Sequence, residues 1–363
     1  MGIGRFAYTP LLPGLQETLG WTVAQAGDVA SANYLGYLLG AMLASVLVHR
    51  SQRHLGLFVG MLFSGLTTFA GAWITSYYLW MALRFFSGIA SAFCLILGTA
   101  VVVEVFVRHA RPQLGSLYFA GLSVGIIGSV LIIEAVRLSG YSVFAQWGLL
   151  GLVSLIMLLG AWGVLRRLRP ASGRFAAAET SQSEPSTNGA LRRLIIAYGL
   201  FGFGYVVTAT FIVAMARQFD NAAVLEPATW IVVGLVGGPS LFVWQHLAAR
   251  IGVFTSLRIA YAIEAVGVLL AGTASNAYVV VLGGALLGGT FMAITALALA
   301  AARQVAGSNQ DKAFAWMTIS FGLGQLLGPA IAGRMAELTQ SFAAPSALAA
   351  ALLLAGMLLI KPR

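Results

Sequence analysis

Residues 143–165, VFAQWGLLGLVSLIMLLGAWGVL, form a long run without a single charged side chain. A helix needs about 20 mostly apolar residues to cross the hydrocarbon core of a bilayer, so this run predicts a membrane-spanning helix. Residues 277–302 form a second uncharged run of the same kind. Nine further stretches meet the same criterion: 29–48, 55–74, 78–103, 113–136, 194–216, 228–248, 256–274, 313–335 and 342–360. The sequence therefore predicts an all-α polytopic membrane protein.

The composition of the chain agrees with this fold class and excludes several others. Of its 363 residues, 59% are apolar and 9% are charged, whereas a soluble chain is typically about a quarter charged. This excludes a soluble globular protein, a disordered chain and a collagen. The single cysteine, Cys94, excludes an intrachain disulfide framework. The alternating pattern of an outer-membrane barrel is absent.

The N-terminal stretch 1–15, MGIGRFAYTPLLPGL, is apolar but too short to span and contains Arg5. It lacks the order of a signal peptide, in which the basic residue precedes the apolar run. We interpret it as the second half of a first helix that is truncated, or whose start codon is misplaced, which brings the total to twelve helices. An apolar extension of about ten residues is then expected upstream of Met1.

Basic residues in the short connections predict the orientation of the chain, because cytoplasmic loops carry an excess of lysine and arginine. The net charge is +10, and sixteen of the 21 basic residues fall on one side of the predicted topology. The other side carries Arg137, Arg217 and Arg334. We therefore expect an inner-membrane protein with both termini in the cytoplasm. Topology accounts for the basic balance, so no nucleic-acid partner is expected.

A polar segment divides the chain into two similar halves. Residues 166–193 are rich in serine, threonine, proline and glutamate and predict a flexible cytoplasmic linker. The expected domains are a six-helix bundle at 1–165 with an incomplete first helix, and a second at 194–363. Glycines recur across the linker at an offset near 200: Gly2/Gly202, Gly4/Gly204, Gly36/Gly234, Gly40/Gly238, Gly88/Gly288 and Gly128/Gly328. Two parallel repeats of this kind are typical of transporters with a central site.

Three motifs carry a resemblance to a known family. They are GIGRFAYTPLLP (2–13), GFGYVVTATF (202–211) and FGLGQLLGPAIAG (321–333). The chain resembles the major facilitator superfamily over its whole length, and most of all its bacterial YbfB/YjiJ-type branch. The superfamily's helix 4 pattern of arginine and glycine is matched by Arg84 and Gly88. Its acidic cytoplasmic loop motif is not matched, because Ala249 stands where the acid is expected.

Motifs for enzymatic or ATP-driven chemistry are absent from the sequence. There is no phosphate-binding loop of the G-x-x-x-x-G-K-[ST] type, so transport would be driven by a gradient or by diffusion. The four histidines lie at predicted helix ends and form no H-E-x-x-H set. We therefore expect no enzyme activity, no catalytic residue, no cofactor and no metal site.

Polar residues inside the spans are the candidates for substrate binding, because ionisable groups in hydrocarbon are costly. Arg5 lies near the middle of helix 1, and the resemblance implies that helices 1, 4, 7 and 10 line the cavity. Arg5 would then bind an anionic substrate, or alternatively clamp backbone carbonyls or an acidic residue, or reach the cytoplasmic surface. The other candidates are polar groups that either share the ligand or form interhelical hydrogen bonds: Tyr8, Thr9, Asn33, Tyr37, Tyr118, Tyr205, Thr208 and Gln325.

Arg84 and Glu134 are the candidates for proton coupling. Each lies 25 residues from the turn near His109, so an antiparallel hairpin would place them at matching depth as an ion pair. The alternative is a local pair between Glu134 and Arg137, three apart on one helix. Helix 11 carries Arg334 and Glu337 in the reverse order, which favours outer-end pairs without a transport role. Glu264 in helix 9 is expected to have a structural partner.

These observations predict a secondary transporter that moves a small solute across the inner membrane by alternating access. The preferred mode is proton-coupled efflux, and the alternatives are proton-coupled uptake or a receptor that binds a ligand without moving it. A membrane enzyme lacks the required acid–base cluster. The expected partners are a small-molecule substrate and the lipid bilayer, and the chain is expected to act as a monomer.

Overall fold

A computed structural model describes residues 1–47, 52–108, 117–167, 188–220, 222–307 and 309–361. This part of the chain contains helices and no strand. The helices are α1 (Tyr8–Leu19), α2 (Val23–Leu47), α3 (Arg53–Ala70), α4 (Tyr77–Arg108), α5 (Leu117–Leu138), α6 (Val143–Leu165), α7 (Asn188–Ala216), α8 (Ala222–Ile251), α9 (Val253–Gly272), α10 (Ala277–Val305), α11 (Gln310–Thr339) and α12 (Ala343–Leu359). The all-α prediction is confirmed.

Eight of the described helices are long and apolar enough to cross a membrane: α4 to α11. The apolar helix α12 has 17 residues, just below the usual length of a span. Helix α1 has only 12 residues. The outward face of α6 exposes large apolar side chains such as Ile156 and Leu159, as expected of a surface that contacts lipid.

Local capping explains where the first two helices differ from the predicted spans. The backbone N–H of Thr22 donates to Gln25 Oε1, and the N–H of Gln25 donates back to Thr22 Oγ1. This reciprocal capping begins α2 at Val23, six residues before the apolar run. Helix α1 ends at Leu19, and the C-cap residue Gly20 adopts a left-handed conformation with φ of 67°. Turns rather than regular helix occupy residues 2–7.

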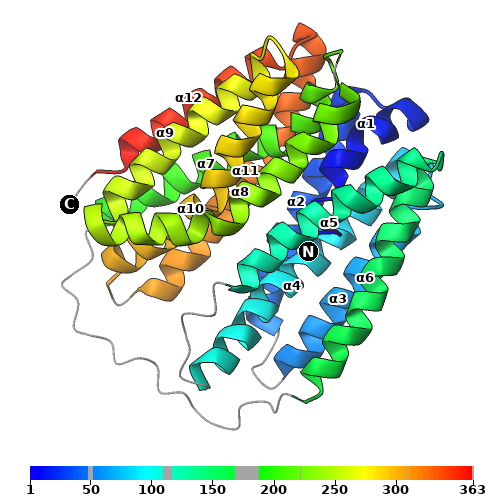
Figure 1. Ribbon diagram of the computed structural model, residues 1–363. Coiled ribbons are helices and arrows are strands. Elements are labelled where there is room, and N and C mark those ends of the chain that lie inside the picture. The colour runs from blue at the N-terminus through cyan, green and yellow to red at the C-terminus, as the bar shows by residue number, and fades with distance from the viewer. Residues whose placement is uncertain (48–51, 109–116, 168–187, 221, 308, 362–363) are drawn as a thin grey trace.

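The helices form two bundles, α1 to α6 and α7 to α12, which Figure 1 shows side by side. Across the boundary, α2 packs on α11, α5 on α8 and α1 on α7. Small residues make the α2–α11 contact close: the Cα of Gly27 lies against the carbonyl of Pro329, and that of Gly333 against the carbonyl of Val23. The domain boundaries stay a prediction, because residues 168–187 lie outside the described residues.

The connections of the helices define two ends of the molecule. At one end, which we call the distal end, α1 meets α2, α5 meets α6, α7 meets α8, α9 meets α10 and α11 meets α12. At the opposite end, which we call the linker end, α6 ends and α7 begins (Figure 1). Helix α7 is the most buried of the eight candidate spans. Its central position makes it a scaffold for side chains that face the first bundle.

Candidate functional site

Arg5 is a buried cation at the boundary between the two bundles. Its side chain is 6% exposed and belongs to the turn segment that precedes α1. Its guanidinium carbon lies 4.2 Å from the ring centre of Tyr37, 4.9 Å from that of Tyr34 and 5.5 Å from that of Phe6. These rings stabilise the charge in part through cation–π interactions.

The hydrogen-bonding capacity of Arg5 is only partly used. Its Nε and Nη2 atoms are buried and have no hydrogen-bond partner. Among the described residues, no carboxylate forms an ion pair with it. Two unpaired guanidinium donors in a buried position are costly. An anion that accepts hydrogen bonds from both Nε and Nη2 of Arg5 would satisfy these donors.

Tyr205 and Gln325 approach the same region from the second bundle. The side-chain amide of Gln325 on α11 donates to the hydroxyl of Tyr205 on α7, and Gln325 Oε1 has no partner. Tyr205 lies close enough to Arg5, Tyr34 and Tyr37 to interact with them electrostatically. Arg5 and Tyr205 also occupy matching positions of the two sequence halves. The structure thus brings four predicted residues together: Arg5, Tyr37, Tyr205 and Gln325.

Tyr8 and Thr9 both donate hydrogen bonds to backbone carbonyls of other helices. The hydroxyl of Tyr8 donates to the carbonyl of Ala26 on α2, at 2.8 Å. The hydroxyl of Thr9 donates to the carbonyl of Ala209 on α7, at 2.7 Å. Because both donors are used on backbone carbonyls, these side chains connect helices, and the Thr9 bond joins the two bundles.

Asn33 and Tyr118 also make interhelical hydrogen bonds. The amide of Asn33 donates to the carbonyl of Arg84 at 2.8 Å, and its Oδ1 atom has no partner. The hydroxyl of Tyr118 donates to the carbonyl of Cys94 at 2.7 Å. Thr208 is buried with no partner for its hydroxyl. Of these three, Asn33 and Thr208 keep a free polar atom.

The predicted ion pair between Arg84 and Glu134 is wrong. Arg84 is 3% exposed, and its Nη1 and Nη2 atoms donate to the carbonyls of Gly4 and Arg5 at 2.8 and 3.1 Å. Glu134 pairs instead with Arg137 on the same helix, at 2.6 Å. The cause is packing: α4 packs mainly on α2 and α3, whereas α5 packs on α6 and α8. Arg84 therefore holds the turn segment that carries Arg5.

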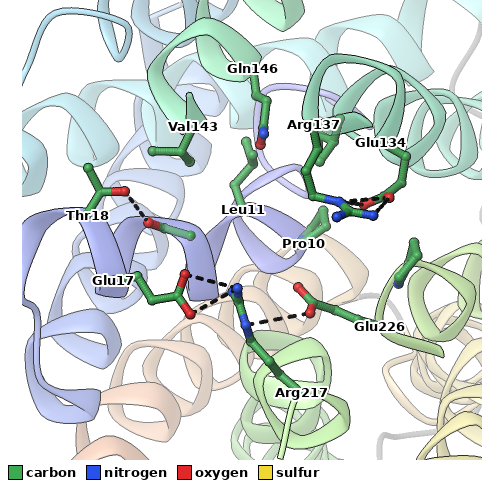
Figure 2. Close-up of a pocket in the computed structure, with 13 residues that line it drawn as sticks. Pro10, Leu11, Glu17, Thr18, Glu134, Arg137, Val143, Gln146, Arg217 and Glu226 are labelled. Carbon is green, nitrogen blue, oxygen red and sulfur yellow. Dashed lines mark hydrogen bonds and ion pairs between the residues drawn. The ribbon is translucent and has the colours of Figure 1, made fainter. Parts of the chain in front are cut away.

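A cavity of about 410 Å³ lies at the distal end, between the bundles, and Figure 2 shows its charged walls. Arg217, at the end of α7, lies 3.0 Å from Glu17 of α1 and 3.7 Å from Glu226 of α8. The cavity is lined by Pro10, Leu11, Gly14, Glu17, Thr18, Ile133, Glu134, Arg137, Val143, Gln146, Arg217, Glu226 and Pro227. The Arg217–Glu17 pair connects the two bundles.

A second ion pair joins the bundles at the same end. Arg334 on α11 donates to both carboxylate oxygens of Asp28 on α2, at 2.6 and 3.0 Å. Glu337 accepts from the backbone N–H of Ala24, at 3.1 Å. The expected local pair of Arg334 with Glu337 is therefore replaced by contacts across the boundary. We call the Arg217–Glu17 and Arg334–Asp28 pairs the distal ion pairs.

Sequence reasoning missed Tyr34 and the distal ion pairs. Tyr34 lies three residues before Tyr37, so helical periodicity places both on one face, and this spacing could have identified it. The partners of Arg217 and Arg334 are distant in sequence. Only the packing of α1 on α7 and of α2 on α11 brings them together.

Comparisons with known proteins agree on a transporter. Residues 1–361 match the family described as "Uncharacterised MFS-type transporter YbfB". The 4-hydroxybenzoate transporter PcaK of Pseudomonas aeruginosa is 28% identical over 160 residues, which cover 44% of this chain and 36% of that protein. The match thus spans about a third of the relative's length.

Solved structures share the fold. The nucleoside transporter NupG has a TM-score of 0.74 at 14% identity, covering 100% of this chain and 98% of that chain. A mutant form of the same transporter has a TM-score of 0.75, again at 14% identity, covering 99% of this chain and 98% of that chain. At this identity the likeness concerns the fold alone.

Proposed function

Because this chain belongs to the YbfB-type family of major facilitator transporters, we propose that it is a secondary transporter of a small organic anion. In this proposal it works as a monomer in the bacterial inner membrane, by alternating access, and exports its substrate in exchange for protons. Uptake by symport with protons and ligand binding without transport are the competing possibilities.

The observation that carries the proposal is the unpaired guanidinium of Arg5. An ionisable group buried in a membrane protein marks a functional site by default. Arg5 has two free donors and faces Tyr37 and Tyr34, while Tyr205 and Gln325 approach from the other bundle. A carboxylate accepts two parallel hydrogen bonds from a guanidinium. A bound carboxylate would thus supply both the missing charge and the missing acceptors.

The distal ion pairs support alternating access. One pair joins Glu17 on α1 to Arg217 at the end of α7, and the other joins α2 to α11. Both pairs must separate before a solute could pass between the bundles at that end. The excess of basic residues at the linker end favours a cytoplasmic position for that end. In this proposal the distal end faces outward, and the distal ion pairs hold it closed.

The substrates named for PcaK and NupG suggest two compounds for a transport test. PcaK is described as a 4-hydroxybenzoate transporter and NupG as a nucleoside transporter. 4-Hydroxybenzoate is an anion at neutral pH, whereas a nucleoside such as uridine is uncharged. Because Arg5 is an unpaired cation, we expect the carboxylate to be the better substrate.

The test uses the full chain in vesicles with an imposed pH gradient. We expect movement of labelled 4-hydroxybenzoate or of another carboxylate in a panel of aromatic and aliphatic acids, and no movement of uridine. Arg5→Gln keeps a polar side chain but removes the charge, and should abolish this transport. Matched control vesicles carry Arg137→Gln, which removes an exposed arginine outside the Arg5 region. Carboxylate transport that survives Arg5→Gln would contradict the proposal.

A further inference from the structure

Glu264 stands apart from the other carboxylates of the chain by its depth in the bundle. It lies 11 residues from the start and 8 residues from the end of α9. Among the described residues, every other acidic residue lies within five residues of a helix end or in a short connection: Glu17, Asp28, Glu104, Glu134, Asp220, Glu226, Asp311 and Glu337. In the part of the chain that the structure describes, Glu264 is thus the one carboxylate in the middle of a span.

The surroundings of Glu264 provide no positive charge. Its side chain is 0% exposed, its Oε2 atom contacts the hydroxyl of Thr290 on α10, and its Oε1 atom has no partner. Among the described residues it forms no ion pair. An ionised carboxylate in such a position costs several kcal/mol, so the neutral acid is favoured.

The hydrogen bonds of Thr290 point to the same protonation state. Its hydroxyl oxygen lies 2.6 Å from the carbonyl of Leu286, one turn earlier on α10, and also contacts Glu264 Oε2. A hydroxyl has one hydrogen to donate. When that hydrogen is donated to Leu286, the Glu264 contact is a hydrogen bond only if the acid carries a proton and donates it to Thr290 Oγ1.

The titratable groups on the helices packed against Glu264 do not favour its ionised form over the neutral acid. Tyr261, on α9 itself, interacts electrostatically with Glu264 and with Tyr198 on α7, and Tyr205 lies farther along α7. Helix α12 has no titratable residue. The remaining groups lie toward the ends of α7, α8, α9 and α10: Arg192, Arg193, Glu226, His246, Arg250, Arg258, Tyr278 and Arg303. The middle of this helix cluster is therefore free of cations.

Two routes of aromatic contacts connect the surroundings of Glu264 with Tyr205, near Arg5. Phe291 follows Thr290 on α10, and its ring is nearly parallel to that of Tyr205, at 6.2 Å and 10°. The ring centre of Tyr261, one turn before Glu264, lies 5.8 Å from that of Phe201. The ring of Phe201 stacks on that of Tyr205, with 5.0 Å between the ring centres. A change in the α9–α10 contact would therefore reach Tyr205 through two routes.

We propose that Glu264 is the proton-binding site of this transporter, occupied by a proton in the structure described here. The proposal rests on the proton coupling put forward under the proposed function, and it replaces Glu134 as the proton carrier. Binding converts the carboxylate to the neutral acid, which donates to Thr290. Release of the proton leaves a charge that requires water or a cation, so it requires the α9–α10 contact to open.

The first test needs no substrate. Infrared spectra of the full chain in lipid vesicles at neutral pH should show the carbonyl band of a protonated carboxylic acid, and Glu264→Gln should remove it. Glu134→Gln is the matched control and should leave the band unchanged, because Glu134 is ion-paired with Arg137. Thr290→Val removes the hydrogen bond and should shift the band to higher frequency, which serves as a second readout if Glu264→Gln does not fold. A band that neither variant alters would overturn the proposal.

The second test uses 4-hydroxybenzoate in vesicles. With Glu264→Gln, exchange of labelled for unlabelled solute at equal pH should persist, while accumulation driven by a pH gradient should fall to the level without a gradient. Glu134→Gln should keep both. Full gradient-driven accumulation by Glu264→Gln would overturn the proposal. If 4-hydroxybenzoate is not moved at all, the proposed substrate fails, and the infrared result still decides the protonation of Glu264.

Discussion

Removing the distal ion pairs should shift the equilibrium between closed and open forms of the distal end. The perturbation is the double variant Glu17→Gln and Asp28→Asn, which neutralises the first-bundle member of each pair. Arg334 and Asp28 are 55% and 22% exposed and joined by two hydrogen bonds, so we assign this pair about 1 kcal/mol. Arg217 and Glu17 are 35% and 66% exposed, which limits that pair to about 0.5 kcal/mol.

The two contributions together, about 1.5 kcal/mol, correspond to a shift of about tenfold in the population of the open form. The assay is a distance measurement between spin labels at Ser139→Cys and Ser275→Cys, two exposed positions at the distal end of different bundles. Cys94 is buried and is the sole native cysteine, so Cys94→Ser gives a clean background. The double variant should populate a longer distance about ten times more than the parent.

Glu134→Gln is the matched control for this experiment. It removes a carboxylate from an ion pair at the same end, but both members of that pair lie on α5. It should leave the distance distribution unchanged. An equal shift in the control, or no shift in the double variant, would refute the idea that the distal ion pairs hold this end closed.

Three further predictions follow from individual contacts. Arg5→Lys should retain part of the carboxylate transport if charge alone matters, and none if two parallel hydrogen bonds are needed, whereas undiminished transport would remove Arg5 from the site. Arg84→Gln should lower the free energy of unfolding by about 2 kcal/mol or more, because the buried carbonyls of Gly4 and Arg5 lose their donors. An unchanged melting temperature would contradict the idea that Arg84 holds the turn segment in place. Gly324→Ala should be destabilising by about 1–3 kcal/mol, because a methyl group there meets backbone atoms of α7, whereas Gly128→Ala meets open space and should not lower the stability; comparable melting temperatures would refute this difference.

Hydropathy predicted the spans well where apolar residues continue to the helix ends. The predicted run 143–165 coincides with α6, and 277–302 ends three residues before α10 does. It failed where polar residues belong to the helix. Glu17 and Thr18 continue α1 beyond the apolar stretch, and Gln25 and Asp28 lie in the first two turns of α2. Hydropathy measures the preference for lipid, whereas the helix is set by backbone hydrogen bonds and capping.

The central residues of the candidate site were predictable for a related reason. A charge such as Arg5 inside an apolar run is visible in a sequence, and so is a tyrosine on the same helical face as another. The partners are not visible, because they depend on which helices touch and on the rotation of each helix. Matching Arg84 with Glu134 by depth assumed that consecutive helices pack together, and here α5 packs on α8 instead. The roles of the individual residues stay predictions.

The contact between α1 and α7 has a consequence for the charges that the two halves must carry there. Thr9 bonds to Ala209 and Glu17 pairs with Arg217, and in both cases the partners are 200 residues apart, the same offset that relates Gly2 to Gly202. Equivalent positions of the two halves thus contact each other between α1 and the α7 end of the second bundle. A symmetric dimer of a single half would place two glutamates or two arginines there, and like charges repel. The Glu17–Arg217 pair therefore requires two halves that carry opposite charges at this position. Exchanging the two residues, Glu17→Arg with Arg217→Glu, preserves the complementarity, whereas either change alone places two like charges opposite each other.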